Sequence, residues 1–155
     1  MLIVDYQSKS YYRFLNDMYQ IAAYKKRFLI TFNGASEIDL ATAISDLSEQ
    51  TKKEVLRSSV IANKASENAV SAIFNDAREK RHVLLFEQAD VLYSQQTAVK
   101  KAHEREHTFD LNFFFKSIAK HNGVVVLATE NKQTLSASMS TKMDVVVRFS
   151  KQASL

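Results

Sequence analysis

The residues best suited to chemistry lie in the stretch HVLLFEQADVLY, residues 82–93. Its four consecutive apolar residues, 83–86, are typical of a strand that is buried on both faces of a parallel sheet. Glu87 and Gln88 follow at once, and ligands of α/β folds bind beyond the carboxyl ends of such strands. Glu87 could hold a cation there, whereas the Gln88 amide cannot serve as a general base. The pattern predicts a functional edge of the sheet that lacks a general base.

Similar apolar runs predict the other strands that would position these side chains. They cover residues 28–32, 124–128 and 145–147, with a weaker candidate at 54–58. The segments between them carry apolar residues at helical spacing, and a further helix is expected within the first thirty residues. This alternation predicts a three-layer α/β domain with a five-stranded parallel sheet and right-handed crossovers. The loops after Phe32, Phe86 and Ala128 would then form the site.

The composition suits one globular domain, residues 1–155, with an N-terminal helical segment at 1–26 and the core at 27–150. The chain has 155 residues, of which 46% are hydrophobic. The absence of cysteine excludes disulfides and thiolate metal sites, and it fits the reducing cytoplasm, where we expect the protein. No signal-peptide pattern and no membrane-spanning apolar run are present, so we expect no membrane association.

The charge and the glycine content bear on two classes of function, nucleic-acid binding and phosphate binding by a glycine-rich loop. The net charge of +4, from 21 Lys and Arg against 17 Asp and Glu, could favour nucleic acid as a partner. The basic residues are scattered, however, which favours an ordinary solvated surface. The only glycines are Gly34 and Gly123, whereas average usage would give about ten in a chain of this length. A glycine-rich phosphate loop is therefore not expected.

The order of the motifs resembles the core of the AAA+ ATPases, from about residue 28 to residue 149. VLLFEQADVLY resembles the Walker B strand of that family, and GVVVLATENKQTL resembles its sensor-1 strand. SENAVSAIFNDARE, VKKAHEREH and MDVVVRFS fall where the family has its corresponding segments. The resemblance implies a P-loop NTPase fold with strand order 5-1-4-3-2, in a family whose cofactor is ATP with Mg²⁺.

The phosphate-binding loop of that family is Gly-x-x-x-x-Gly-Lys-Ser/Thr, in which backbone amides and the lysine hold the phosphates. The corresponding residues are Thr31, Asn33, Gly34, Ala35, Ser36, Glu37 and Ile38. Glu37 replaces the lysine and reverses an interaction worth about 4 kcal/mol at 4 Å and an effective dielectric of 20. A micromolar site has only about 8 kcal/mol in total, so we expect neither ATP nor Mg²⁺ as a cofactor.

The same segment suits a helix that begins after Ser36. Ser36 and Asp39 match a capping-box pattern, and Glu37 and Asp39 place carboxylates in the first turn. We prefer this self-capped helix to a phosphate site, because the N-terminus of a helix is stabilised by either kind of anion.

The residues at the remaining family positions also depart from the pattern that ATP hydrolysis requires. Glu87 stands at the Walker B aspartate, Gln88 at the catalytic glutamate and Glu130 at the sensor-1 asparagine. Thr141 and Lys142 stand where paired arginines are expected. Residues 62–64, Ala-Asn-Lys, replace the threading loop, and the chain ends at residue 155 without the C-terminal lid of the family. The resemblance thus implies a degenerate domain without a catalytic residue.

Two metal hypotheses arise from the polar residues. Glu37, Glu87 and Glu130 could converge, with Asp39 and Asp90 nearby, to hold Ca²⁺ or Mg²⁺. Solvated or lysine-paired carboxylates are the favoured alternative. Residues 103–107, His-Glu-Arg-Glu-His, match a zinc-protease motif, but they lie in a charged stretch without an apolar face, which favours coincidence. We therefore predict no metal centre.

We predict a catalytically inactive, pseudo-ATPase-like domain that acts as a protein-interaction or regulatory module. Its expected partner is an active AAA+ homologue or a second copy of the chain. One alternative is an atypical ATP-binding protein or ATPase that uses Glu87 for Mg²⁺ and backbone amides near Gly34. The other alternative is a nucleic-acid-binding module that uses the basic surplus.

Overall fold

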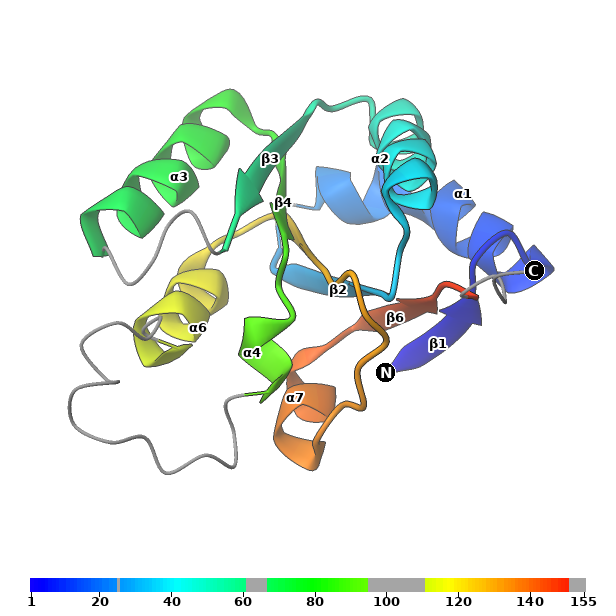
Figure 1. Ribbon diagram of the computed structural model, residues 1–155. Coiled ribbons are helices and arrows are strands. Elements are labelled where there is room, and N and C mark those ends of the chain that lie inside the picture. The colour runs from blue at the N-terminus through cyan, green and yellow to red at the C-terminus, as the bar shows by residue number, and fades with distance from the viewer. Residues whose placement is uncertain (25, 61–66, 95–110, 151–155) are drawn as a thin grey trace.

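The structure is a computed structural model that describes residues 1–24, 26–60, 67–94 and 111–150. Its strands form one parallel sheet, which Figure 1 shows between helices. The strands are β1 (Leu2–Asp5), β2 (Phe28–Asn33), β3 (Val55–Ser59), β4 (Val83–Glu87), β5 (Val124–Ala128) and β6 (Val145–Arg148). The helices are α1 (Lys9–Ala23), α2 (Glu37–Thr51), α3 (Glu67–Lys80), α4 (Val91–Ser94), α6 (Leu111–Lys120) and α7 (Ala137–Lys142).

The sheet confirms the predicted fold class and adds one strand to it. The six strands lie in the order β1-β6-β2-β5-β4-β3. Leaving out β1, this is the order 5-1-4-3-2 that the family resemblance implied. The prediction of five strands was therefore one strand short.

The additional strand corrects the prediction of a wholly helical N-terminal segment. β1 pairs with β6, with Leu2 opposite Val145 and Asp5 opposite Arg148. Only Val4 of its four residues is buried, and Leu2 and Ile3 are about half exposed. An edge strand with a single buried side chain has almost no periodic pattern. The helix begins later, after Ser8, whose Oγ accepts a hydrogen bond from the backbone N–H of Tyr11 at 3.2 Å.

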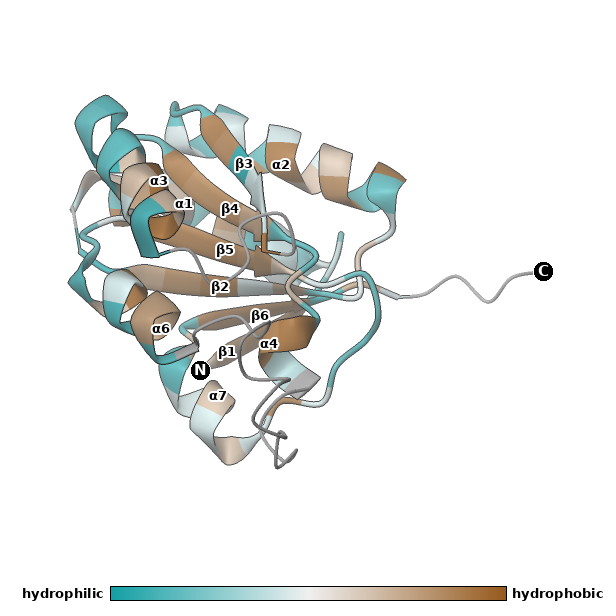
Figure 2. Cartoon of the chain, turned by 60° about the vertical axis from the view of Figure 1, so that its left-hand side comes forward, coloured by the Kyte–Doolittle hydropathy of each residue, from teal (hydrophilic) through white to brown (hydrophobic). Residues whose placement is uncertain are grey.

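Helices cover both faces of the sheet, as expected for continuous apolar strands. α1 and α2 pack on one face, and α3, α4, α6 and α7 pack on the other. Successive residues of a strand serve the two cores alternately: Ile30 and Phe32 face α1 and α2, whereas Leu29 faces the opposite side. Figure 2 shows that the strands are mostly hydrophobic, whereas the helices carry both hydrophobic and hydrophilic residues. Among the described residues, no helix combines the length and the apolar character needed to cross a membrane.

Candidate functional site

A pocket of about 400 Å³ lies at the carboxyl edge of the sheet, where the sequence predicted the site. It lies among the ends of β2, β4 and β5 and the start of α2. Six of the predicted site residues line it: Ala35, Ser36, Glu37, Gln88, Glu87 and Glu130. The other lining residues are Leu40, Arg57, Ala128, Thr129 and Asn131. Arg57 and Thr129, which line the same pocket, were not among the predicted site residues.

The start of α2 has the cap that the sequence predicted. Ser36 has an extended backbone, and its Oγ accepts a hydrogen bond from the backbone N–H of Asp39 at 3.1 Å. Glu37 and Asp39 lie in the first turn, where carboxylates interact favourably with the positive end of the helix dipole. Ile38, at the position of the Mg²⁺-binding hydroxyl, is 81% exposed. The carboxylates of the helix itself thus lie at its positive end.

Thr31 lies inside β2 rather than in the loop after it. Its hydroxyl is fully buried and shares a hydrogen bond of 2.8 Å with the Tyr93 hydroxyl. It also donates to Sδ of Met143 at 2.9 Å. Burial raises the pKa of Tyr93, so this phenol stays protonated and paired at neutral pH. The residue aligned with the first glycine of the phosphate loop is therefore a core residue.

Only Gly34, Ala35 and Ser36 connect β2 to α2, and the first two are tied to the end of β5. The backbone N–H of Gly34 donates to Oγ1 of Thr129 at 2.9 Å, and that of Ala35 donates to the Thr129 carbonyl at 3.0 Å. Gly34 has φ of 77°, and a Cβ there would come within 3.3 Å of the Lys132 backbone. Two amides that could have faced a phosphate group instead hold the neighbouring loop.

The Asn33 side chain forms hydrogen bonds with the loop that follows β5. It is 4% exposed, and its Nδ2 donates to the Gln133 carbonyl at 2.8 Å. Its Oδ1 accepts from the backbone N–H of Gln133 at 2.8 Å and from Oγ1 of Thr129 at 3.3 Å. One side chain therefore satisfies both backbone groups of Gln133. The loops after β2 and β5 behave as one hydrogen-bonded unit.

Asp90 holds the same loop from the side of β4. Its carboxylate accepts from the backbone N–H groups of Glu130 and Asn131, each at 3.0 Å, and from Nε2 of Gln133 at 3.2 Å. The Glu130 side chain itself is exposed. Asp90, which the sequence placed near a carboxylate cluster, is therefore a positioning residue for the backbone of residues 130–133.

Glu87 forms an ion pair with a cation from the neighbouring strand. Its Oε2 accepts from Nη2 of Arg57 at 2.7 Å and from Nε of Arg57 at 2.8 Å. The pairing register explains this contact, because Ser59 lies opposite Glu87 and Arg57 lies two residues earlier on the same face. The Glu87 carboxylate is thus already paired with a positive charge from the protein.

Gln88 follows in a left-handed backbone conformation, with φ of 57°. Its Oε1 accepts a short hydrogen bond from the Ser59 hydroxyl of β3. The side chains of Glu87, the last residue of β4, and of Gln88 therefore both bind residues of β3. An amide in this place can orient a polar group but cannot take a proton from water.

The carboxylates that were considered as a possible metal site do not form a metal-binding group among the described residues. Glu37, Glu87 and Glu130 line one pocket, yet in the described ranges no three His, Cys, Asp or Glu side chains are placed to hold a metal ion. The motif at residues 103–107 and the segment at 62–64 lie outside the described residues.

Thr141 and Lys142 lie on α7, and neither lines the carboxyl-edge pocket. The Thr141 hydroxyl donates to the Ser138 carbonyl at 2.8 Å. Nζ of Lys142 lies 3.4 Å from Oγ of Ser138 and 5.5 Å from the centre of the Phe115 ring. Within the described residues, these local contacts account for both side chains.

The exposure of the Arg57–Glu87 pair predicts a small effect on stability. The two side chains are 43% and 30% exposed, so replacing Arg57 with Gln should lower the free energy of unfolding by no more than about 1 kcal/mol. Urea denaturation measures this change. The matched control is Arg148→Gln, which breaks another exposed interstrand pair, Arg148 Nε to Asp5 at 2.9 Å. A loss at Arg57 several times that at Arg148 would contradict the assignment of Arg57–Glu87 as a screened surface pair.

Comparison with known proteins identifies the family of the chain. The model of the family described as "ATPase family associated with various cellular activities (AAA)" matches residues 29–151. No curated protein sequence shows significant similarity to the chain.

Solved structures show the same fold at low sequence identity. A chain in the structure of the E. coli MS115-1 HORMA:CdnC:Trip13 complex is 19% identical, with a TM-score of 0.55, over 95% of this chain and 55% of that one. The FIGL-1 AAA domain in complex with ADP is 15% identical, with a TM-score of 0.63, over 90% and 52%. C. elegans PCH-2 is 14% identical, with a TM-score of 0.53, over 97% and 45%. The chain spans about half the length of these solved chains.

Proposed function

Because this chain belongs to the AAA family of ATPases, we propose that it retains the family core but acts by binding a protein partner rather than by hydrolysing ATP. The observation that carries this proposal is the state of the loop between β2 and α2. The amides of Gly34 and Ala35 donate to Thr129, and Ser36 caps the helix. The chain's own groups thus use the donors that a phosphate group would need.

The charge at the helix start supports the same proposal. Glu37 lines the pocket at the position of the phosphate-binding lysine. A carboxylate there repels a phosphate group by about as much as a lysine would attract it, and it also weakens the attraction of the helix dipole. A nucleotide that binds at this edge would have to overcome the repulsion by Glu37. It would also have to compensate for the loss of the hydrogen bonds to Thr129.

The arrangement at β4 argues against hydrolysis. The Arg57 guanidinium already neutralises Glu87, and Gln88 has no basic atom with which to activate water. The sheet and its two cores are nevertheless intact. A domain that keeps its shape while its catalytic positions differ is suited to recognition by surface contact.

The proposed partner is a protein, either an active AAA+ homologue or a second copy of this chain. Among the similar structures, Trip13 is found in a complex with HORMA and CdnC proteins. For this chain, the partner class is an inference from family membership. Light scattering of the purified chain, alone and mixed with an AAA+ homologue from the same source, tests it. A strictly monomeric chain that forms no complex with the homologue would contradict the assignment of partner.

Nucleotide-binding calorimetry tests the loss of the family cofactor. We expect ADP and ATP, with and without Mg²⁺, to give no heat that depends on the carboxyl-edge pocket. The competing hypothesis of an ATP-binding protein that uses Glu87 for Mg²⁺ predicts Mg²⁺-dependent binding that is lost in Glu87→Gln. The variant Arg57→Gln serves as a control, because it frees the Glu87 carboxylate and would strengthen any true Mg²⁺ site. ATP hydrolysis that is abolished by Glu87→Gln would disprove the proposed function.

A further inference from the structure

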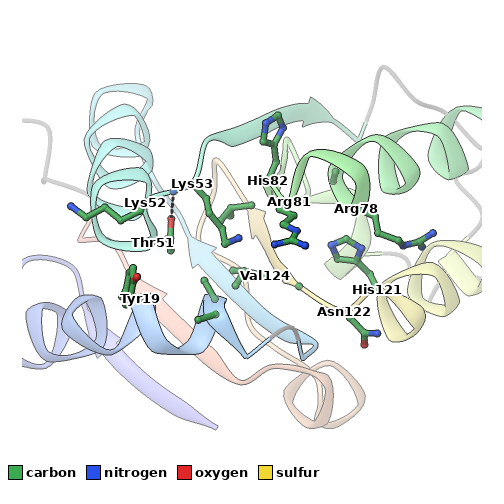
Figure 3. A pocket seen from close by; sticks show the side chains of 15 residues that line it. Tyr19, Thr51, Lys52, Lys53, Arg78, Arg81, His82, His121, Asn122 and Val124 are labelled. Carbon is green, nitrogen blue, oxygen red and sulfur yellow. Dashed lines mark hydrogen bonds between the residues drawn. The ribbon is translucent and has the colours of Figure 1, made fainter.

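A second and larger pocket lies at the opposite edge of the sheet, below the amino ends of β4 and β5. Its volume is about 590 Å³, which is in the range of sites for small organic ligands. The first residues of these two strands, Val83 and Val124, line it, together with the last turns of α1, α2 and α3. Figure 3 shows the side chains around this space, which we call the amino-edge pocket. No residue of the carboxyl-edge pocket takes part in it.

The rim of the amino-edge pocket is strongly basic. Lys52, Lys53, Arg78 and Arg81 line it, and no acidic residue does. Within the described part of the chain, none of these four side chains forms a salt bridge. Glu54, the neighbouring acidic residue in sequence, contacts His82 at 3.4 Å instead. The pocket therefore combines four formal positive charges with open space.

His121 adds a buried polar group without a hydrogen-bond partner. The residue is 2% exposed, and neither ring nitrogen has a partner among the described residues. The ring packs edge-on against Phe74, with centroids 5.3 Å apart. Burial and the charge of Arg78 lower the pKa of His121, so the neutral ring presents one N–H donor and one lone pair. Buried polar atoms are nearly always paired, so these two nitrogens indicate that a partner is missing.

Gly123 makes room for that ring. A Cβ at this position would lie 2.8 Å from Nε2 of His121, which is too close for any real contact. In Figure 3 the Arg81 and His121 side chains extend toward the same region between α3 and β5. The pocket thus has a buried hydrogen-bonding group at its base and flexible cations at its rim.

The ends of the surrounding helices offer a simpler reason for the basic residues. α2, α3 and α6 all end at this edge, and cations near a helix C-terminus are stabilised by its dipole. Each helix end carries only about half an elementary negative charge, however, so four cations leave the rim clearly positive. Helix ends also do not explain the unpaired nitrogens of His121.

Two of the cations occupy unusual backbone positions. Lys52 and Arg81 have φ of 58° and 57°, in the left-handed region that favours Gly and Asn. Each directly follows the helix it terminates, and in Figure 3 the Arg81 side chain extends into the pocket, whereas the Lys52 side chain points away from it. Neither residue type is explained by backbone preference, so a role for the charge is the better explanation for Arg81.

We infer that the amino-edge pocket binds a small molecule that carries a phosphate group, held by Lys53 and Arg81 and by the buried ring of His121, whose side chains extend toward the same space in Figure 3. An arginine fork and lysine ammonium groups are the usual donors to phosphate oxygens. The apolar side chains of Ala22, Ala77 and Val83 would contact the rest of the ligand. This site differs from the family's nucleotide position, which lies at the other end of the strands.

Calorimetry of the full chain with inorganic pyrophosphate tests the inference. We expect saturable binding that weakens as the salt concentration rises. The double variant Lys53→Gln/Arg81→Asn removes the two charges that face the pocket, and Asn tolerates the left-handed backbone at residue 81. It should weaken binding at least about tenfold, because it removes charge-assisted hydrogen bonds. Citrate should compete poorly, and binding of citrate without binding of pyrophosphate would overturn the choice of phosphate.

The control keeps the same change in net charge. Lys9→Gln/Arg13→Gln removes two exposed cations from the far end of α1, and neither residue lines the pocket. We expect it to bind pyrophosphate within about twofold of the unmodified chain, because screening removes distant charge effects. Thermal melting verifies that both double variants fold. No saturable binding by the unmodified chain, or equal weakening in both double variants, would overturn the inference.

A separate measurement addresses His121. The variant His121→Phe keeps an aromatic ring against Phe74 but removes both nitrogens, and it should weaken pyrophosphate binding several-fold. NMR of the histidine side chains in the unmodified chain gives the same information without a variant. The ring nitrogen signals of His121 should shift when pyrophosphate binds, and unchanged signals would remove His121 from the site.

Nucleotides separate this inference from the proposed function. ADP bound in the amino-edge pocket would compete with pyrophosphate, and its binding would be lost in Lys53→Gln/Arg81→Asn. ADP bound at the start of α2 would survive that variant and would not compete with pyrophosphate. The first result supports the pocket without restoring a family nucleotide site. The second result contradicts the proposed function. The inferred phosphate site would then be tested by pyrophosphate binding alone.

Discussion

Replacing Phe86 with Ala should lower the free energy of unfolding by about 3–5 kcal/mol, the range for large-to-small changes in a packed core. Phe86 is 1% exposed and lies on β4, the second strand from one edge of the sheet. Its ring packs against Phe114 and Phe74, with centroids 4.8 and 5.7 Å apart. The change would leave a cavity between β4 and the helices α3 and α6. For a chain of this size, the melting temperature should fall by about 6–20 °C.

Two further variants make this expectation specific. Phe86→Leu fills most of the cavity and should cost clearly less than Phe86→Ala. Ile38→Ala removes a side chain that is 81% exposed and should change stability by less than about 0.5 kcal/mol. Chemical denaturation gives the three free energies. A cost for Phe86→Ala below about 1 kcal/mol would mean that β4 is not central to the core.

The position of Phe86 illustrates which parts of the fold the sequence could predict. β2, β4, β5 and β6 are buried on both faces, so each appears as a run of apolar residues. The edge strands are harder. β1 buries only Val4, and β3 has no fully buried residue and carries Arg57 in its centre. Edge strands make fewer side-chain contacts, so their sequences are less constrained and β1 was missed.

In the site, contacts between residues close in sequence could be predicted, whereas contacts between distant residues could not. The cap of α2 was predictable because Ser36 and Asp39 lie three residues apart. The contacts that determine the shape of the pocket join residues far apart in sequence. Asn33 and Gln133 are 100 residues apart, and Arg57 and Glu87 are 30 apart. No periodic pattern reports such a pair, although the strand register places Arg57 beside Glu87 once the sheet order is known.

The hydrogen bonds of Asn33 have a consequence for the proposed function. If the loop between β2 and α2 is closed to phosphate because its amides are bound to Thr129, then the position of Thr129 matters as much as the charge of Glu37. Asn33 and Asp90 fix the loop that follows Thr129. Loosening that loop should therefore expose the amides of Gly34 and Ala35 before it affects the rest of the sheet.

Asn33→Ala is the variant that tests this coupling. It leaves the N–H and the carbonyl of Gln133 without their partner, and unsatisfied buried groups typically cost about 1–3 kcal/mol each. We expect a loss of about 2–4 kcal/mol in the free energy of unfolding, because water can reach part of the loop. Hydrogen exchange measured by NMR should show faster exchange at the amides of Gly34, Ala35 and Gln133.

The matched control for Asn33→Ala lies in the same loop. The Asn131 side chain is exposed, and only its backbone N–H contributes to the network, by donating to Asp90. Asn131→Ala makes the same chemical change and should leave stability within about 0.5 kcal/mol and exchange at Gly34 unchanged. If both variants were equally mild, the amides of Gly34 and Ala35 would be held without Asn33. The closed state of the loop would then depend on the hydrogen bonds to Thr129 and on the cap at Ser36, which do not involve Asn33.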